Sequence, residues 1–369
     1  MSAVEIFWWK ENKPSTKIEG SWVKCMKMSD NLQKLQKLCD TYGISGDECL
    51  VREVILKEIS EYASDIKIDN LGNIIAFKKG SKTPRKKIML SAHMDEVGFI
   101  VTYITDDGLL KFNTVGGIDS KVICGKSVIV GKNQIPGVIG VKPVHLLELE
   151  ERQKNIVFDD LYIDIGAVNK EEAMSFVSPG DSVCFVANFK YENNMIKSKA
   201  IDDRVGCFVL INLMQQELLY DMYFTFVVQE EIGLRGAKVA AFEVDPDIAI
   251  VVEATTAADI RGTTSEKQVC KVGNGTVIAF MDKSTIYDRE LYDLALNIAK
   301  ENNIKIQIKS LVAGGNDAGA IHLSRNGVKT IAVSLPCRYL HTACGMICVD
   351  DILDTQKLVQ KLSEKACSI

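Results

Sequence analysis

The chain has 369 residues, of which 47% are hydrophobic and 25% charged, and its mean hydropathy is +0.05. This composition excludes a disordered, collagen-like or coiled-coil protein. The formal charge is −5 and both signs are interleaved, so we expect no nucleic-acid partner. No apolar run approaches the ~20 residues that span a bilayer, so no membrane partner is expected. The 11 cysteines contain no CxxC pair and the N-terminus has no signal-peptide pattern, which favours a cytoplasmic protein without a disulfide framework.

Residues 1–28 differ from the rest of the chain. They contain all three tryptophans, Trp8, Trp9 and Trp22, and no sustained helical or strand period. Because order is commonly lost at chain termini, we expect a poorly ordered extension here, or a start of the protein at Met26 or Met28. A functional arm is the alternative.

Two helices are predicted next. Leucines at helical spacing (Leu32, Leu35 and Leu38) follow Ser29 and the pattern stops at Gly43. Ser45 and Glu48 then match a capping box, with the serine as the N-cap and the glutamate three residues on. The helix that this box opens should bury one apolar face, made of Leu50, Val54, Ile55 and Ile59.

Beyond residue 60, short β-rich runs alternate with amphipathic helices, which is typical of an α/β sheet with helices on its faces. The clearest predicted strands are 73–77, 86–92, 222–229, 247–253, 304–310 and 328–335. The predicted helices cover about 205–219, 289–301 and 352–362.

Residues 97–198 show strands and glycine-rich turns with little helical period. The predicted strands are 99–104, 127–131, 137–141 and 182–187. We therefore predict an all-β, barrel-like domain inserted into an α/β catalytic domain, whose two parts would be residues 29–96 and 199–369. Strand edges in such an insert must be paired or covered, and we expect neighbouring subunits to cover them.

One histidine and five acids gather at the ends of the predicted strands and at one helix start. They are His93, Asp202, Asp203, Glu230, Glu231 and Glu253. Any one of them alone would usually be a cap or a solvated strand end. Because ligands bind at the carboxyl ends of strands in open α/β sheets, the whole set indicates one functional crevice.

Imidazole and carboxylate ligands together suit zinc or another divalent ion such as cobalt or manganese. More carboxylates than one tetrahedral ion needs indicate two ions that share a bridging carboxylate. The adjacent acids Glu230 and Glu231 allow one to act as general base and the other as ligand. Of the other histidines, His341 follows strand 328–335 and is the better ligand candidate, whereas His145 and His322 are expected to be structural.

Six motifs occur in the order in which one peptidase family has them: GISGDE, SAHMDEVGF, AIDDRVGC, QEEIGLRGA, GGNDAGAIHLSRNGV and PCRYLHT. From about residue 38 onward the chain thus resembles the tetrahedral aminopeptidases, a family of dinuclear metallopeptidases also called glutamyl or deblocking aminopeptidases. Some members are labelled endoglucanases. The resemblance implies a zinc-peptidase-like catalytic domain, with a mixed sheet flanked by helices, and a homododecamer built from dimers through the insert. Short peptides would be the substrates.

The resemblance also implies roles for the residues that match the family motifs. The implied ligands of the two divalent ions are His93, Asp202, Glu231, Glu253 and His341. Asp202 would bridge the ions, Glu230 would be the general base, and Asp95 would orient the imidazole of His93.

Two departures from the family pattern bear on the activity. The family more often has aspartate at the position of Glu253, and in related peptidases a glutamate there tends to accompany carboxypeptidase activity. After His341 the chain reads Thr-Ala-Cys where the family commonly has Ser-Pro. The sequence predicts an aminopeptidase. A carboxypeptidase or N-acyl deacylase with the same two ions and a non-catalytic peptide-binding protein are the alternatives. A glycosidase is disfavoured because it needs two carboxylates and would leave His93 and His341 without use.

Overall fold

The computed structural model describes residues 31–368, and the predicted extension 1–28 lies outside them. Residues 31–40 are helical, as the leucine spacing predicts. The elements described below belong to one unit, Leu35–Ile369. Within residues 31–368, every helix is too short or too polar to cross a bilayer.

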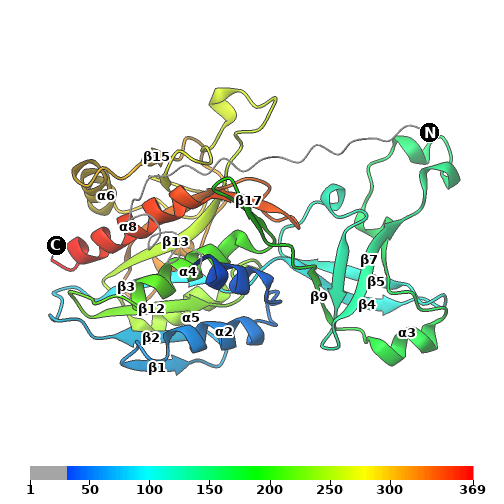
Figure 1. The fold of residues 1–369 in the computed structure, drawn as a ribbon, viewed down its shortest axis with the longest axis horizontal. Coiled ribbons are helices and arrows are strands. Elements are labelled where there is room, and N and C mark those ends of the chain that lie inside the picture. Colours follow the sequence, from blue (N-terminus) through cyan, green and yellow to red (C-terminus); the bar gives the residue numbers. More distant parts are fainter. Residues whose placement is uncertain (1–30, 369) are drawn as a thin grey trace, which may run out of the picture. The chain divides into compact units, whose positions relative to one another are not determined.

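An eight-stranded mixed sheet forms the α/β part, in the order β1-β2-β12-β3-β13-β16-β14-β15 (Figure 1). The strands are β1 Asp65–Ile68, β2 Ile74–Lys78, β3 Ile88–His93, β12 Met222–Val227, β13 Ile248–Thr256, β14 Thr276–Ile278, β15 Ile306–Ile308 and β16 Lys329–Cys337. Strands β12, β3, β13 and β16 run parallel at the centre, and β2 and β14 pair antiparallel on either side of them. The predicted mixed sheet is confirmed.

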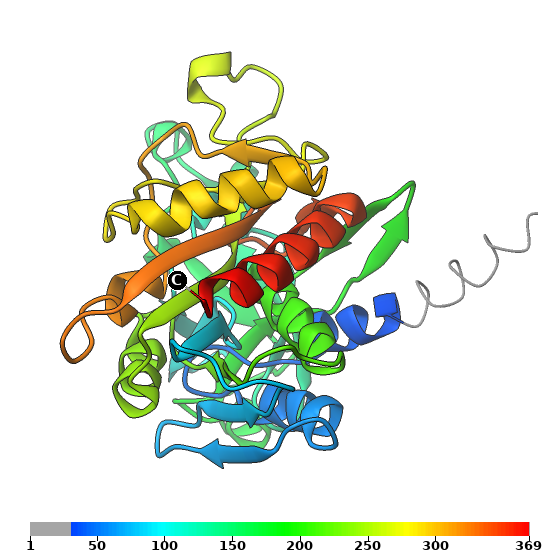
Figure 2. The same cartoon turned by 90° about the vertical axis from the view of Figure 1, so that its left-hand side faces the viewer.

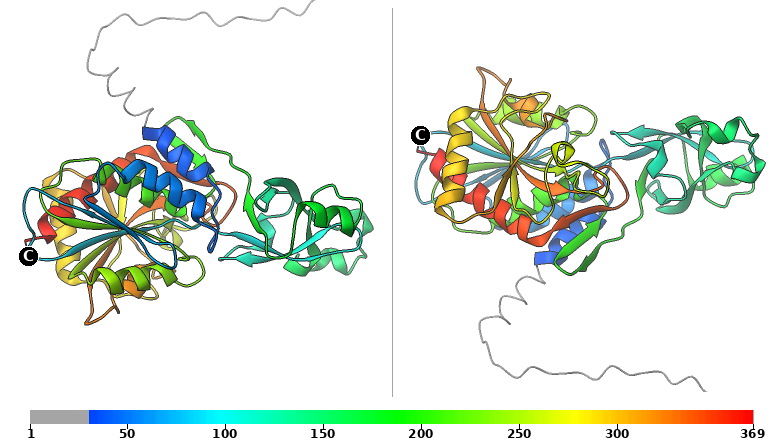
Figure 3. Two further views of the ribbon diagram at one scale, coloured as in Figure 1. Left: turned by 90° about the horizontal axis from the view of Figure 1, so that it is seen from below. Right: turned by 90° about the horizontal axis from the view of Figure 1, so that it is seen from above.

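Helices cover both faces of this sheet (Figure 3). They are α2 Cys49–Ile59, α4 Ile201–Met214, α5 Arg235–Val244, α6 Arg289–Glu301, α7 Ala318–Ile321 and α8 Val349–Ala366. One face is covered by α4 and α8, and Figure 2 shows α6 (yellow) beside α8 (red) over β16. Helices α5 and α7 pack on the other face, against alternate residues of the central strands such as Met89 and Val251. Since both faces are covered, β3 is buried along its whole length.

The inserted strands close into a six-stranded barrel, in the order β4-β5-β8-β7-β6-β9. The strands are β4 Gly98–Ile104, β5 Leu110–Val115, β6 Ser127–Val130, β7 Ile135–Val141, β8 Leu161–Asp164 and β9 Ser182–Phe185. The ring of Phe99 packs edge-on against those of Phe112 and Phe185 in the core, at centroid distances of 5.0 and 5.5 Å. The predicted barrel is thus confirmed. These six strands leave no edge for a neighbouring subunit to cover, because each pairs with another barrel strand on both sides.

The segment 97–198 also contains helices, which its sequence pattern did not predict. They are α3 Lys170–Phe176 and short 3₁₀ turns at Ser120–Val122, Val144–Leu146, Glu151–Gln153 and Phe158–Asp160. The side chain of Asn169 caps α3 by accepting a hydrogen bond from the backbone N–H of Glu172. Strands β10 Lys190–Glu192 and β11 Met195–Ser198 leave the barrel and form a small antiparallel sheet with β17 Gly345–Cys348.

The predicted capping box is wrong. Helix α2 begins at Cys49, and Glu48 makes no side-chain cap bond with it. The hydroxyl of Ser45 donates instead to Oδ2 of Asp95 at 2.6 Å, and Oε1 of Glu48 accepts from the backbone N–H of Gln229 at 3.1 Å. Both side chains are therefore used by distant segments. The buried face of the helix also differs from the prediction: it consists of Val51, Ile55 and Ile59, and Leu50 is 43% exposed.

Candidate functional site

The structure brings all seven predicted site residues to one end of the central parallel strands. They are His93, Asp95, Asp202, Glu230, Glu231, Glu253 and His341. Strand β13 continues to Thr256 beyond Glu253, so this glutamate lies within a strand rather than at its end. Side chains alternate between the two faces of a strand, so the side chain of Glu253 points to the same face as those of Ala249 and Val251. This is the face of the sheet that α5 and α7 cover.

The imidazole of His93 is 1% exposed and has acceptors on both sides. Its Nε2 lies 3.2 Å from Oε1 of Glu253, 3.3 Å from Oδ1 of Asp202 and 3.9 Å from Oε2 of Glu230. Its Nδ1 lies 3.1 Å from the backbone oxygen of Asp95 and 3.4 Å from the Oδ1 of that residue. A proton held on Nδ1 by these acceptors leaves the lone pair of Nε2 facing the carboxylates.

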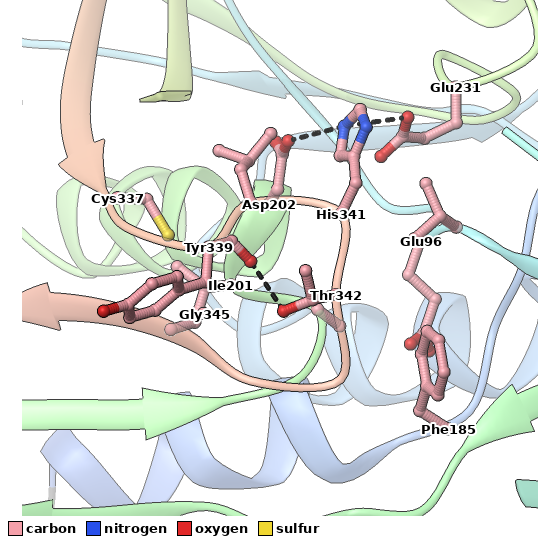
Figure 4. A pocket seen from close by; sticks show the side chains of 13 residues that line it. Glu96, Phe185, Ile201, Asp202, Glu231, Cys337, Tyr339, His341, Thr342 and Gly345 are labelled. Carbon is pink, nitrogen blue, oxygen red and sulfur yellow. Dashed lines mark hydrogen bonds and ion pairs between the residues drawn. The ribbon is translucent and has the colours of Figure 1, made fainter. Parts of the chain in front are cut away.

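The imidazole of His341 has the same arrangement (Figure 4). Its Nε2 lies 3.4 Å from Oδ2 of Asp202 and 3.3 Å from Oε2 of Glu231. Its Nδ1 faces the backbone oxygen of Gly117 at 2.9 Å. The two carboxylate oxygens of Asp202 therefore face two different imidazoles, as a carboxylate that bridges two sites would.

The donor set fits divalent metal ions. Two atoms bound at about 2.1 Å to one tetrahedral ion lie about 3.4 Å apart. The pairs formed by His93 with Glu253 and by His341 with Glu231 lie at 3.2 and 3.3 Å. Oε2 of Glu253 is buried without a hydrogen-bond partner. Nitrogen and carboxylate donors in this combination are those of zinc, cobalt and manganese sites.

The pKa values of these side chains are raised, which indicates an excess of buried negative charge. Burial and the charge of Asp202 raise the pKa of Glu231 to about 8. Burial raises the pKa of Glu253 to about 7, with Asp202 adding to the shift and His93 opposing it. Burial opposes a charged imidazole at His341, yet Asp202 and Glu231 raise its pKa to about 9. A divalent cation would relieve this repulsion.

Asp95 has a second role besides facing His93. Its Oδ1 accepts from the backbone N–H of Glu230 at 3.0 Å, and its Oδ2 accepts from that of Glu231 at 3.1 Å. The preceding residue, Gln229, has a φ of 56° and is held by Glu48. Asp95 and Glu48 thus fix the turn that presents the two glutamates.

Two acids that the sequence analysis did not select as ligands lie in the same region. Asp203 offers an oxygen within 4.8 Å of ligand atoms of His93 and Glu253, and its Oδ1 accepts from the backbone N–H of Gly206 at 3.0 Å. Asp317 is fully buried, and neither of its carboxylate oxygens has a hydrogen-bond partner. Both residues stand in the quoted motifs, AIDDRVGC and GGNDAG, which is the signal that could have found them.

The two remaining histidines are not part of the candidate metal-binding groups. His145 is exposed in the 3₁₀ turn Val144–Leu146, and Nδ1 of His322 faces the backbone oxygen of Ala318 at 2.8 Å.

Comparisons with known proteins agree with this architecture. Residues 72–358 match the family model described as M42 glutamyl aminopeptidase. A relative from Acetivibrio thermocellus is 42% identical over 336 residues, which is 90% of this chain and 98% of the relative. The lysyl aminopeptidase of Pyrococcus furiosus is 33% identical and covers 90% of this chain, with 96% of its own length matched.

Solved structures give the same result. The TET aminopeptidase of a marine sediment archaeon, a Thaumarchaeota archaeon, superposes with a TM-score of 0.88 at 34% identity, covering 92% of this chain and 97% of its own. The Pyrococcus horikoshii TET1 peptidase, described as assembling into a tetrahedron or a large octahedral shell, has a TM-score of 0.79 at 37% identity, with 90% and 99% covered. The chain is therefore a peptidase that belongs to the M42 glutamyl aminopeptidase family.

Proposed function

We propose that the protein is an aminopeptidase that uses two divalent metal ions, zinc, cobalt or manganese, to remove N-terminal residues from short peptides. His93 and Glu253 would hold one ion, His341 and Glu231 the other, and Asp202 would bridge them. The observation that carries this proposal is that the two oxygens of Asp202 face two different imidazoles, at 3.3 and 3.4 Å.

The ions, when bound, would supply Lewis-acid activation of the attacking water and of the scissile carbonyl. Glu230 is the general base in this proposal: it accepts the proton of the attacking water and returns it to the leaving amine. Burial raises the pKa of Glu230 well above its usual range, and the charge of Glu253 adds to this shift. Its carboxylate can therefore hold a proton between the two steps. Asp95 keeps Glu230 in place through the backbone of the turn.

One peptide in three forms separates aminopeptidase from carboxypeptidase action. The forms are unmodified, acetylated at the amine, and amidated at the carboxylate. We expect release of the first residue from the unmodified and amidated forms and no reaction with the acetylated form. If the acetylated peptide is cleaved and the amidated peptide is not, a carboxypeptidase is favoured. Release of acetate would favour a deacylase. If no form is cleaved under any metal condition, the non-catalytic alternative is favoured.

Activity should depend on metal. Every ligand in the proposal is a side chain that binds an exchangeable ion, so treatment with a chelator should abolish peptide hydrolysis and added zinc, cobalt or manganese should restore it. Elemental analysis on the same samples measures the ions per chain, with two expected. Full activity in protein that elemental analysis shows to be metal-free contradicts the proposal.

We propose that the protein assembles into a homododecamer built from dimers. The Pyrococcus horikoshii relative is described as a tetrahedron or octahedral shell. In addition, Val144, Leu146 and Leu149, between β7 and β8, are 67%, 58% and 76% exposed, and exposed apolar clusters commonly mark interfaces. Light scattering at micromolar concentration should give the mass of a large oligomer, and replacing these three side chains by serine should lower it. A strict monomer would contradict the proposal and leave the chemistry of the site unaffected.

A further inference from the structure

The two histidines that are proposed as ligands are held in different ways. His93 ends β3, is 1% exposed and pairs with Val227 of the neighbouring strand. His341 lies in the loop between β16 and β17, and its side chain is 33% exposed. Tyr339 and His341 have φ values of 59° and 57°, a left-handed conformation that non-glycine residues keep only where their surroundings hold them. The place of the His341 imidazole therefore depends on what fixes this loop.

Several hydrogen bonds give the loop its shape. The hydroxyl of Thr342 donates to the backbone oxygen of Tyr339 at 2.7 Å (Figure 4), and it accepts from the backbone N–H of Cys344 at 3.1 Å. At the base of the loop, Arg338 and Met346 exchange two backbone hydrogen bonds of 3.0 Å. All these bonds lie within residues 338–346, so they shape the loop without attaching it to the strand beside it.

The side chain of Arg338 attaches the base of the loop to the segment that follows β13. Its Nε donates to Oδ1 of Asp259 at 2.8 Å, and its Nη2 donates to Oδ2 at 2.5 Å. A bidentate pair of this kind fixes the relative orientation of the two groups as well as their distance. The backbone oxygen of Gly117 orients the ring of His341, but it does not hold the backbone that carries the ring.

Asp259 is itself held by the sheet and by the wall of the cavity beside the candidate metal ligands. It lies three residues beyond Thr256, where the parallel pairing of β13 with β16 ends opposite Cys337. Its Oδ2 also accepts from the backbone N–H of Val272 at 3.2 Å. Thr256 and Val269 line that cavity, which has a volume of about 510 Å³. The carboxylate is thus a fixed point from which the loop of His341 can be positioned.

We infer that Asp259 is a positioning residue, which holds the proposed ligand His341 in place through Arg338. The ion that this imidazole would share with Glu231 is therefore the one whose affinity depends on Asp259. The inference rests on the proposed function, because it requires His341 to bind a metal ion. Asp259 lies outside the six motifs of the family.

The effect of Asp259 should be confined to one of the two ions. The proposed ligands of the other ion, His93 and Glu253, lie in β3 and β13, and each of these strands pairs with a strand on both sides. Their backbones are therefore fixed without the ion pair of Asp259 with Arg338. Loss of that pair should weaken the ion at His341 and leave the ion at His93 in place.

The test is a calorimetric titration of the metal-free, full-length protein with zinc. Two binding events are expected in the unchanged protein, and His341→Ala identifies the event that belongs to its ion by removing it. We expect Asp259→Asn to weaken that event by about 10- to 100-fold, the usual effect of removing a group that orients a metal ligand. The other event should stay within about twofold of its affinity in the unchanged protein.

Arg338→Gln separates positioning from a simple effect of charge. Asp259→Asn removes a negative charge, which by itself would weaken the binding of a cation, whereas Arg338→Gln removes a positive charge, which by itself would strengthen it. If the pair positions His341, both variants weaken the same binding event, because each breaks the same contact. Opposite shifts in the two variants would show that the pair acts through charge, and the inference would be wrong.

The matched control is Asp293→Asn, which breaks the exposed pair of Asp293 with Arg289 on helix α6. It makes the same chemical change as Asp259→Asn and should leave both binding events unaltered. Equal weakening of both events in Asp259→Asn, as a general loss of structure would cause, overturns the inference, and so does unchanged zinc binding in that variant. Binding of fewer than two ions by the unchanged protein contradicts the proposed function itself.

Discussion

Replacing Glu230 by glutamine is expected to lower kcat by on the order of 10²- to 10⁴-fold, the usual contribution of general acid–base catalysis, with metal content near that of the unchanged protein. The amide keeps the shape of the side chain but cannot accept a proton. Oε2 of Glu230 lies 3.9 Å from Nε2 of His93, farther than the oxygens of Asp202 and Glu253, so the proposed ligands remain. Steady-state kinetics and elemental analysis on one preparation measure both quantities.

Glu231→Gln is the matched comparison for this variant. Both glutamates sit on the turn that Asp95 fixes through backbone N–H groups, so neither change removes the support of the turn. Glu231→Gln should lower metal affinity, because a neutral amide replaces an anionic ligand beside His341. Loss of metal in Glu230→Gln and retention in Glu231→Gln would mean that the roles are reversed. If neither variant changes metal content or rate, the reaction takes place elsewhere.

Arg204→Met is expected to lower the free energy of unfolding by about 3–5 kcal/mol, the usual cost of breaking a buried ion pair. Arg204 is fully buried and, with Lys199, contacts the carboxylate of Glu96. Its guanidinium also donates to the backbone oxygens of Leu38, Thr41, Gly43 and Met94. Methionine fills a similar volume but leaves these acceptors without a donor, and unsatisfied buried acceptors carry a desolvation cost.

Arg289→Met is the control for that variant. Arg289 is 79% exposed and pairs with Asp293 one helical turn away, and exposed pairs of this kind contribute about 0.3–0.5 kcal/mol. Urea unfolding of the three proteins at one protomer concentration measures the differences, because assembly makes stability concentration-dependent. A loss below 1 kcal/mol in Arg204→Met would show that the neighbouring lysine alone neutralises Glu96.

The sheet could be predicted because its central strands are near-continuous apolar runs, a local signal that parallel strands between helical layers require. The sequence did not predict the features that depend on contacts with distant parts of the chain. Helix α3 buries only Ala173, so it has no apolar period to detect. Ser45 and Glu48 have the spacing of a helix cap, yet Ser45 hydrogen-bonds to Asp95 and Glu48 accepts from the backbone of Gln229 instead. Closure of the barrel depends on which strands pair at long range, which no local pattern specifies.

For the candidate site, the sequence predicted which residues come together but not how they contact one another. Strand ends locate the crevice and the family motifs give the residues, so all seven predicted positions meet in the structure. The spacing of Asp202 and Asp203 does not tell which carboxylate faces which imidazole, since that depends on the backbone at the start of α4, where both residues have non-helical φ and ψ.

The barrel lies in the sequence between β3 and the strands that pair with β3. This position affects the order in which strands can pair during translation. Strand β3 is made before the barrel, but its neighbours β12 and β13 are made after it. All six barrel strands pair only with one another, so each barrel strand has both of its pairing partners while β3 still has none. During that interval a strand that is buried along its whole length in the folded protein carries unpaired backbone groups on both edges, which is the condition that favours misassembly between nascent chains. Translation of residues 98–227 is thus the period in which a holding chaperone would have most effect on the yield of this enzyme.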